Sequence, residues 1–215
     1  MKYACRNGVK LACLLLSCAL CIASAQEGLP TTEDTPSKPL DVLREHDARS
    51  REILALSSSD SLSPELRQQF KSHINTAFDF QELSRLSLGS HWTERNPNER
   101  AEFTRLFSAI IKEQNFDRFL EYYRKDDIAY REGNLGADKA TVKALIPLDQ
   151  GDQIEIIYHF RRADNQWLIF DLAIDGASTA EGNRRRYGRY IEKHSYAKLI
   201  LQLQKQLDRL TSKAD

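Results

Sequence analysis

Large apolar residues follow a helical period through much of the first half of the chain. Between residues 64 and 78 they recur at every fourth position, at Leu66, Phe70, Ile74 and Phe78. This spacing places them on one face of an amphipathic helix. A moderately amphipathic pattern also covers residues 41–56, and a helical segment after residue 78 ends at Gly89, a residue that commonly follows the last turn of a helix. These patterns predict helices that each cover a core with one face.

The longest predicted helix occupies residues 96–124. Asn96 can cap it, Pro97 fits its first turn, and Glu99 completes a capping-box pattern. Its apolar stripe comprises Phe103, Leu106, Phe107, Ile110 and Ile111, and continues with Phe119, Leu120 and Tyr123. A stripe of this kind predicts a buried helix face, whatever the function of the protein is.

The apolar period changes to two between residues 127 and 175. Strands are predicted near residues 128–132, 140–148, 153–162 and 167–174. The third strand alternates Ile154, Ile156, Tyr158 and Phe160, and the fourth alternates Leu168, Phe170, Leu172 and Ile174. The turn sequences LDQGDQ and ADNQ predict antiparallel hairpins. A closing helix is predicted over residues 183–210, with a break near Ser195.

The order of these elements predicts an α+β fold. Helices come first, an antiparallel meander of about four strands follows, and a closing helix ends the domain, which we place at residues 41–211. Such helices pack on one face of a curved sheet, which can wrap into a cone with an apolar interior. The pattern fits both a filled core and an apolar pocket.

The N-terminal segment has the pattern of an export signal. Three basic residues precede the apolar run LACLLLSCALCIA, and small residues follow it, so residues 1–25 are predicted to be a signal peptide that is cleaved after Ala25. An alternative is a lipoprotein signal, in which LLSC supplies Cys18 as the lipidated residue. Residues 26–40 are rich in Pro, Thr and charge, and are predicted to be a disordered linker.

Composition and charge exclude several kinds of site. Lysine plus arginine and aspartate plus glutamate both number 31, so the net charge favours no nucleic-acid partner. All four cysteines lie within residues 1–25, so the exported chain is expected to contain no disulfide and no thiolate metal site. The five histidines are scattered without ligand spacing, and no metal or other cofactor is expected.

Two aspartates in the segment WLIFDLAIDGAS could act in catalysis. Asp171, Asp175 and His159 lie on neighbouring strands, and burial in an apolar cavity would raise the pKa of a carboxyl group used as a general acid or base. The alternation, however, places these polar residues opposite the aliphatic face, on the solvated side of the sheet. We therefore expect Asp171 and Asp175 to bond backbone N–H groups at the strand end, or alternatively to pair with Arg184, Arg185 or Arg186.

Four segments taken together resemble the MlaC / toluene-tolerance family of periplasmic lipid carriers. They are LSLGSHW, NPNERAEFTRLFSAII, WLIFDLAIDGAS and NRRRYGRYI, in that order along the chain. The positions that carry the resemblance are Leu88, Gly89, Trp92, Pro97, Arg100, Phe103, Trp167, Asp171, Asp175, Gly176, Ser178, Asn183 and Tyr187. The chain departs from the family where Asn96 precedes the helix-starting proline and where KHSYAKL replaces a glycine-rich break.

This resemblance implies a nuclear-transport-factor-like cone and a carrier that binds phospholipid without catalysis. It implies transport between an outer-membrane lipoprotein–porin complex and an inner-membrane ABC-type complex, by a protein expected to be a periplasmic monomer. Two alternatives are a carrier of another lipid, such as a hopanoid, and an acid/base enzyme that uses Asp171 and His159.

The acyl pocket is expected to draw on two sets of residues. The predicted helices would contribute Leu88, Phe103, Phe107, Ile110 and Ile111, and the sheet would contribute Ile156, Tyr158, Phe160, Phe170, Leu172 and Ile174. Arg184 and Tyr187 are the candidates for the rim of the pocket.

Overall fold

The computed structural model describes residues 38–57, 62–124, 128–148 and 151–212. The predicted signal peptide and most of the predicted linker lie outside these residues. The first helix begins at Pro39, before the predicted domain start at residue 41, because Pro39 occupies its first position and Lys38 before it is extended. Leu40, which the linker prediction included, is buried in this helix.

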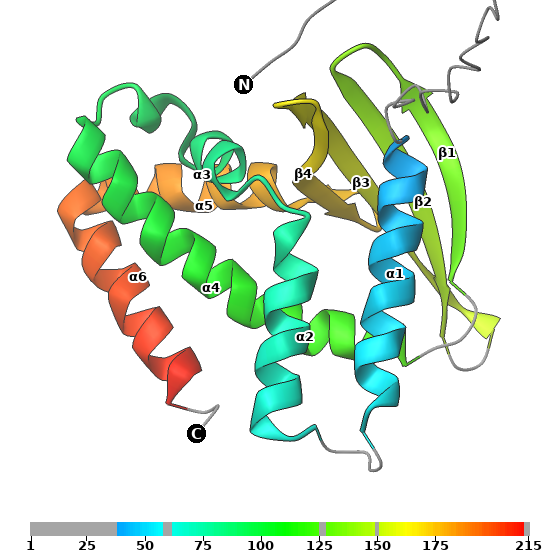
Figure 1. Cartoon of the computed structure of the whole chain (residues 1–215). Helices are drawn as coiled ribbons and strands as arrows, with labels where there is room; N and C mark the ends of the chain where they lie inside the picture. The colour runs from blue at the N-terminus through cyan, green and yellow to red at the C-terminus, as the bar shows by residue number, and fades with distance from the viewer. Residues whose placement is uncertain (1–37, 58–61, 125–127, 149–150, 213–215) are drawn as a thin grey trace, which may run out of the picture. The chain divides into compact units, whose positions relative to one another are not determined.

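Six α-helices and one 3₁₀ helix form the helical part of the described chain (Figure 1). They are α1 (Pro39–Ala55), α2 (Pro64–Thr76), α3 (Phe80–Leu88), η1 (Gly89–Trp92), α4 (Pro97–Tyr123), α5 (Thr179–Lys193) and α6 (Tyr196–Thr211). The predicted capping box of α4 is confirmed, since Asn96 Oδ1 accepts a hydrogen bond from the Glu99 N–H at 3.0 Å and Glu99 bonds back to the Asn96 N–H. The predicted break near Ser195 separates α5 from α6, and α5 begins at Thr179 rather than at residue 183.

The strands form one antiparallel meander. They are β1 (Ala129–Leu135), β2 (Lys139–Pro147), β3 (Gln153–Ala163), β4 (Gln166–Ile174) and β5 (Ala177–Ser178), and each pairs with the next along the chain. The four predicted strands are confirmed, and the two-residue β5 is additional. The predicted α+β class, with helices packed on a curved antiparallel sheet, is also confirmed.

A bulge between β3 and β4 changes which side chains of β4 face the helices. His159 pairs with Asp171, but the next residue, Phe160, pairs with Ile169, so Phe170 is left between them. The other edge of β4 is hydrogen-bonded to the segment after α2. The Ile169 N–H donates to the Ala77 carbonyl, and the Asp79 N–H donates to the Ile169 carbonyl, both at 2.8 Å. The side chain of Ile169 is buried in the core.

The bulge contradicts the simple alternation predicted for the fourth strand. Trp167 and Ile169 are buried in the core, whereas Leu168 and Phe170 are only half-buried and belong to neither apolar cluster described below. The ring of Phe170 lies 6.1 Å from that of His159, a residue that alternates with the buried Tyr158 and Phe160. Beyond the bulge the prediction is correct, since Leu172 faces the core and Ile174 packs against it.

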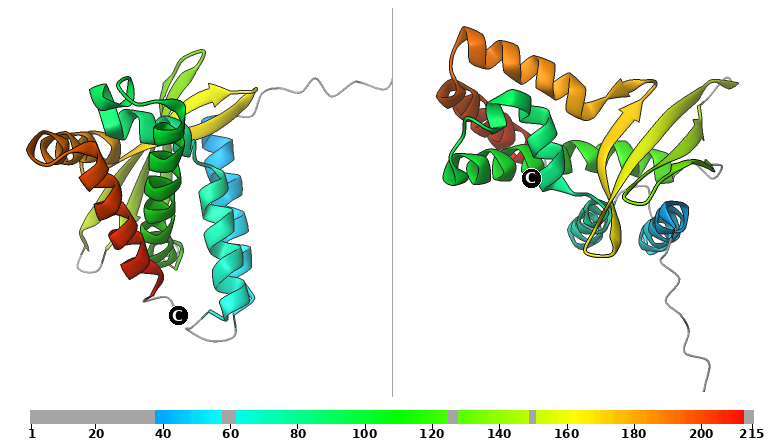
Figure 2. Two further views of the ribbon diagram at one scale, coloured as in Figure 1. Left: turned by 90° about the vertical axis from the view of Figure 1, so that its left-hand side faces the viewer. Right: turned by 90° about the horizontal axis from the view of Figure 1, so that it is seen from above.

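Buried apolar side chains form two separate clusters. The sheet-side cluster joins the inner face of the sheet to α1, α2 and the last turns of α4, with Phe70, Phe116 and Phe160 among its most buried members. The helical cluster lies among α3, α4, α5 and α6, with Phe103 and Phe107 at its centre. In Figure 2, α1 lies beside the sheet, where it contacts β1 and β2, and α2 lies beside α1.

Helix α4 is long enough to belong to both clusters. Its 27 residues span about 40 Å at 1.5 Å per residue. Its first half contributes Phe103 and Phe107 to the helical cluster, and its second half contributes Phe116 and Phe119 to the sheet-side cluster. None of the helices in the described part of the chain is long and apolar enough to cross a membrane.

Candidate functional site

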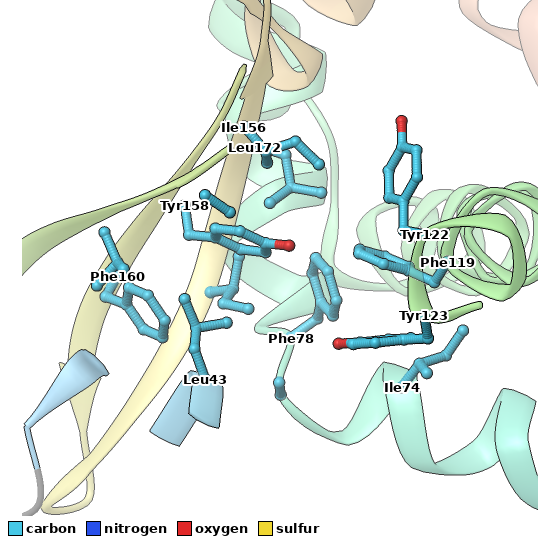
Figure 3. Close-up of a cluster of buried hydrophobic side chains, with 14 of the residues drawn as sticks. Leu43, Ile74, Phe78, Phe119, Tyr122, Tyr123, Ile156, Tyr158, Phe160 and Leu172 are labelled. Carbon is cyan, nitrogen blue, oxygen red and sulfur yellow. The ribbon is translucent and has the colours of Figure 1, made fainter. Parts of the chain in front are cut away.

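The sheet-side cluster contains a small internal cavity. It measures about 10 Å³ and is lined by Leu43, His46, Ile74, Ala77, Phe78, Phe119, Tyr123, Tyr158 and Ile169. These residues come from α1, α2, α4, the α2–α3 junction and two strands. In Figure 3 the ring of Phe78 lies between the sheet residues Tyr158 and Leu172 and the α4 residues Phe119 and Tyr123. A volume of this size holds about one water molecule.

Tyr158 is the member of the predicted sheet set that lines this cavity. Ile156, Tyr158, Phe160 and Leu172 are buried in the sheet-side cluster, and Ile174 packs against it. Phe170 lies on the opposite face because of the bulge, which corrects the prediction for that residue. Whether any of these side chains contacts a ligand stays a prediction.

The helix residues expected to share that pocket lie elsewhere. Leu88, Phe103, Phe107, Ile110 and Ile111 belong to the helical cluster, so they do not face the sheet-side cavity. A helical stripe shows that one face is buried, but not which element buries it. Here the first half of α4 packs on α3 and α6, and only its second half reaches the sheet-side cluster.

The helix residues that do line the sheet-side cavity differ from the predicted ones. Sequence reasoning did not name Leu43, Ile74, Phe78, Phe119 and Tyr123 as pocket residues, although each belongs to a pattern recognised as a buried helix face. The missing information was the pairing of α1 and α2 with the sheet. That pairing joins residues more than 60 positions apart, and it is therefore absent from any local pattern.

The polar groups that line the cavity are uncharged near neutral pH. Burial raises the pKa of the Tyr158 phenol well above its usual value, and it does the same for Tyr123. Burial, and then the neighbouring His73, lower the pKa of His46 to about 4. The His46 and His73 rings stack at 4.5 Å and join α1 to α2. The cavity wall is thus apolar, with neutral polar groups only.

A second, larger cavity lies where the two clusters meet. It measures about 120 Å³ and is lined by Phe78, Leu83, Ile111, Gln114, Asn115, Arg118, Leu172, Thr179, Asn183 and Arg186. Phe78 also lines the first cavity, so its ring separates the two. Apolar side chains from both clusters meet here with polar and cationic side chains of α4 and α5.

Neither rim candidate lies at this cavity. Tyr187 is buried in the helical cluster, where its ring meets those of Phe103 and Phe107 edge-on. Arg184 forms an ion pair with Glu181 at 2.6 Å and lines a different surface pocket with Leu88. Arg186, on the same helix, is the α5 arginine that lines this cavity, and the assignment of a pocket rim to Arg184 and Tyr187 stays a prediction.

An open groove of about 1000 Å³ lies beside α3, the start of α4 and the β3–β4 hairpin. Four of its charged side chains pair with one another, and Arg100, Arg105 and Asp164 also line it. Arg161 lies 3.1 Å from Asp79 and 3.7 Å from Glu82, and Arg85 lies 2.7 Å from Glu82. Charged side chains thus form part of the groove wall, whereas the wall of the sheet-side cavity contains none near neutral pH.

The two aspartates of the fourth strand hold the backbone, as one of the sequence hypotheses predicted. Asp171 accepts hydrogen bonds from Ser178 Oγ at 2.5 Å and from the Ala180 N–H at 2.9 Å. Asp175 accepts one from the Glu155 N–H at 3.0 Å. Arg184, Arg185 and Arg186 instead bond Glu181 or their own neighbours on α5.

This geometry does not support an acid/base pair. Both oxygens of Asp171 are already engaged, and no hydrogen bond joins it to His159 within the described chain. Asp171 is not among the residues that line the described pockets. Among the residues that the structure describes, no group of three His, Cys, Asp or Glu side chains is arranged to hold a metal ion.

The sequence of this chain matches a known protein family. A family model described as "MlaC protein" matches residues 48–205. The chain belongs to the MlaC family. The matched range begins within α1 and ends within α6, so it contains nearly the whole of both clusters.

A solved structure has a similar fold. It is that of a phospholipid-binding protein from Ralstonia solanacearum in complex with a phospholipid, with a TM-score of 0.62 and 14% sequence identity. The match covers 80% of this chain and 95% of that one. A comparison with curated proteins found no match. At this identity the structural likeness establishes the fold, and the family model establishes the membership.

Proposed function

We propose that the protein is a phospholipid-binding carrier that takes acyl chains into the sheet-side cluster. The observation that carries the proposal is the internal cavity, which lies between the inner face of the sheet and α1, α2 and α4 and has no charged group in its wall near neutral pH. Family membership supports it, as does the phospholipid-binding protein of similar fold. No catalytic step is part of this function.

The free energy of lipid extraction sets what such a site has to provide. Each buried methylene contributes roughly 0.8 kcal/mol, so two chains with about 30 methylenes are held in a bilayer by on the order of 24 kcal/mol. A carrier that removes them needs a comparable area of apolar contact. The sheet-side cluster, with 21 buried members, is the larger of the two apolar regions.

Entry of an acyl chain requires the cluster to open, because its cavity holds only about one water. We infer that α1 and α2 move together away from the sheet, since the stacked His46 and His73 rings join them to one another. The segment after α2 would stay in place, because Ala77 and Asp79 are hydrogen-bonded to Ile169 of β4. Lipid would then fill the space between the sheet and the displaced helices.

The proposal also includes a location in the cell and two partner complexes. The carrier would work in the periplasm and exchange phospholipid with an outer-membrane lipoprotein–porin complex and an inner-membrane ABC-type complex. The export signal expected in residues 1–25 supports this location. The carrier would act as a monomer, since one chain supplies the whole apolar cluster.

The test compares two alanine-to-leucine variants that add the same volume to different clusters. Ala77 lines the sheet-side cavity, and Ala180 is buried in the helical cluster. In Ala77→Leu the added side chain occupies space that an acyl chain would use. We expect native mass spectrometry and lipid extraction to find phospholipid on the wild type and several-fold less on Ala77→Leu.

The Ala180→Leu variant serves as the matched control and should keep its lipid. Overpacking of a core costs about 1–3 kcal/mol, so both variants are first compared by circular dichroism and thermal melting. A wild-type protein that co-purifies with no lipid would refute the proposed function. Loss of lipid from Ala180→Leu alone would place the acyl chains in the helical cluster instead.

A further inference from the structure

The cavity between α4 and α5 combines an apolar floor with two arginines at its mouth. Phe78, Leu83, Ile111 and Leu172 form the floor. On α4, Ile111, Gln114, Asn115 and Arg118 share one face, and on α5, Thr179, Asn183 and Arg186 do so, because each set is spaced by three or four residues. The two helices thus present amide and guanidinium groups to one hollow of about 120 Å³.

Among the described residues, the arginines that line this cavity lack the ion pairs that the neighbouring Arg184 and Arg185 form. Arg184 and Arg185 both bond Glu181, at 2.6 and 3.1 Å. Within the described chain, neither Arg186 nor Arg118 forms an ion pair with a carboxylate. Of the three consecutive arginines, the one that lines the cavity is the one whose charge is left without an anion.

Two hydrogen bonds fix the Arg186 guanidinium and leave several of its N–H donors unused. Its Nη2 donates to Asn183 Oδ1 at 2.8 Å and to the Tyr187 hydroxyl at 2.9 Å, and its guanidinium lies 4.8 Å from the centre of the Tyr187 ring. A guanidinium has five N–H donors, so about three remain for a ligand. Its planar fork matches the oxygens of a phosphate group.

We propose that Arg118 and Arg186 bind the phosphodiester of the lipid headgroup, while the acyl chains pass Phe78 into the sheet-side cluster. This inference rests on the proposed function and adds a headgroup site to it. Phe78 and Leu172 connect the two regions, because Phe78 lines both cavities and Leu172 is buried in the sheet-side cluster (Figure 3). The ligand class is therefore an anionic amphiphile, with the phosphate between the arginines and the chains on the apolar floor.

The experiment measures binding of two lipids that have identical labelled acyl chains, one a phosphatidylglycerol and the other a neutral diacylglycerol. It uses the purified wild type, the double variant Arg118→Gln/Arg186→Gln and the control Arg185→Gln, whose arginine is paired with Glu181 away from the cavity. Loss of hydrogen bonds to a charged group predicts that the double variant binds phosphatidylglycerol at least about tenfold more weakly. Its binding of diacylglycerol should be unchanged, and Arg185→Gln should match the wild type for both lipids.

A competition with inorganic phosphate separates the lipid headgroup from free phosphate as the ligand. We expect millimolar phosphate to reduce the preference for phosphatidylglycerol only modestly, because it lacks the chains that anchor the lipid. Phosphate that binds at these arginines without affecting lipid binding would overturn the headgroup assignment. Equal binding of both lipids by the wild type, or an equal loss in Arg185→Gln, would overturn it while leaving the carrier function in place. A wild type that binds neither lipid would overturn both.

Discussion

Replacing Asp171 by alanine should destabilise the fold by about 2–4 kcal/mol without removing a catalytic group. The carboxylate is 7% exposed, and each of its oxygens accepts one hydrogen bond, from Ser178 Oγ and from the Ala180 N–H. Ser178 in turn caps α5 by accepting a bond from the Glu181 N–H at 3.0 Å. Asp171 therefore fixes the start of the helix that carries Tyr187 into the helical cluster.

The magnitude follows from these two bonds. A hydrogen bond to a charged group contributes about 1.5–3 kcal/mol net, and water that enters the space left by the side chain recovers part of the loss. Asp171→Asn keeps one acceptor oxygen and should lose about half as much as Asp171→Ala. For a domain of this size, 1 kcal/mol corresponds to about 2–4 °C in Tm, so the alanine variant should melt roughly 5–15 °C lower.

Urea unfolding followed by circular dichroism measures the loss of stability. A double-mutant cycle with Ser178→Ala tests how much of that loss comes from the hydrogen bond between Asp171 and Ser178. Because Asp171 positions the Ser178 hydroxyl, we expect a coupling of at least about 0.5 kcal/mol between the two changes. A loss below about 0.5 kcal/mol in Asp171→Ala, or no coupling, would refute the structural role. Asp171→Asn protein that remains folded should carry as much phospholipid as the wild type, whereas turnover that depends on Asp171 would favour the enzyme hypothesis.

Two further predictions concern pH and a glycine. Burial first, and His73 second, lower the pKa of His46 from 6.5 to about 4, so the unfolded chain binds the proton more readily and stability should be lost as the pH falls from 6.5 towards 4. His46 is partly screened by solvent, so it should contribute about 1–2 kcal/mol to the difference between the free energies of unfolding measured in urea at pH 7 and at pH 4.5. The variant His46→Gln should lack this contribution. Gly89 has φ of +61°, and a Cβ there would lie 2.9 Å from two side-chain carbons of Arg184. Gly89→Ala should therefore lower the free energy of unfolding by more than about 1 kcal/mol, and an unchanged urea midpoint would contradict this.

Local patterns in the sequence determined the elements and most of their ends. Helix α4 begins where Asn96 and Pro97 predict it, because an N-cap and a first-turn proline act within a few residues. The alternation over β2 and β3 predicted strands that the structure confirms, since side chains of a strand alternate wherever the pairing is regular. The order of these elements was then sufficient for the α+β class.

Only the tertiary structure decided which apolar faces meet. The continuous stripe of α4 divides between two clusters, because α3, α5 and α6 cover its first half and α2 with the sheet covers its second. The bulge opposite His159 turns Phe170 outward and Ile169 inward, and it arises where β3 pairs with β4 and the α2–α3 junction bonds to Ile169. Which of the three consecutive arginines lines the second cavity likewise depends on which face of α5 is turned towards α4. The physical reason is the same in each case: periodicity records what a residue does within its own element, whereas contacts between distant elements depend on packing that no local pattern contains.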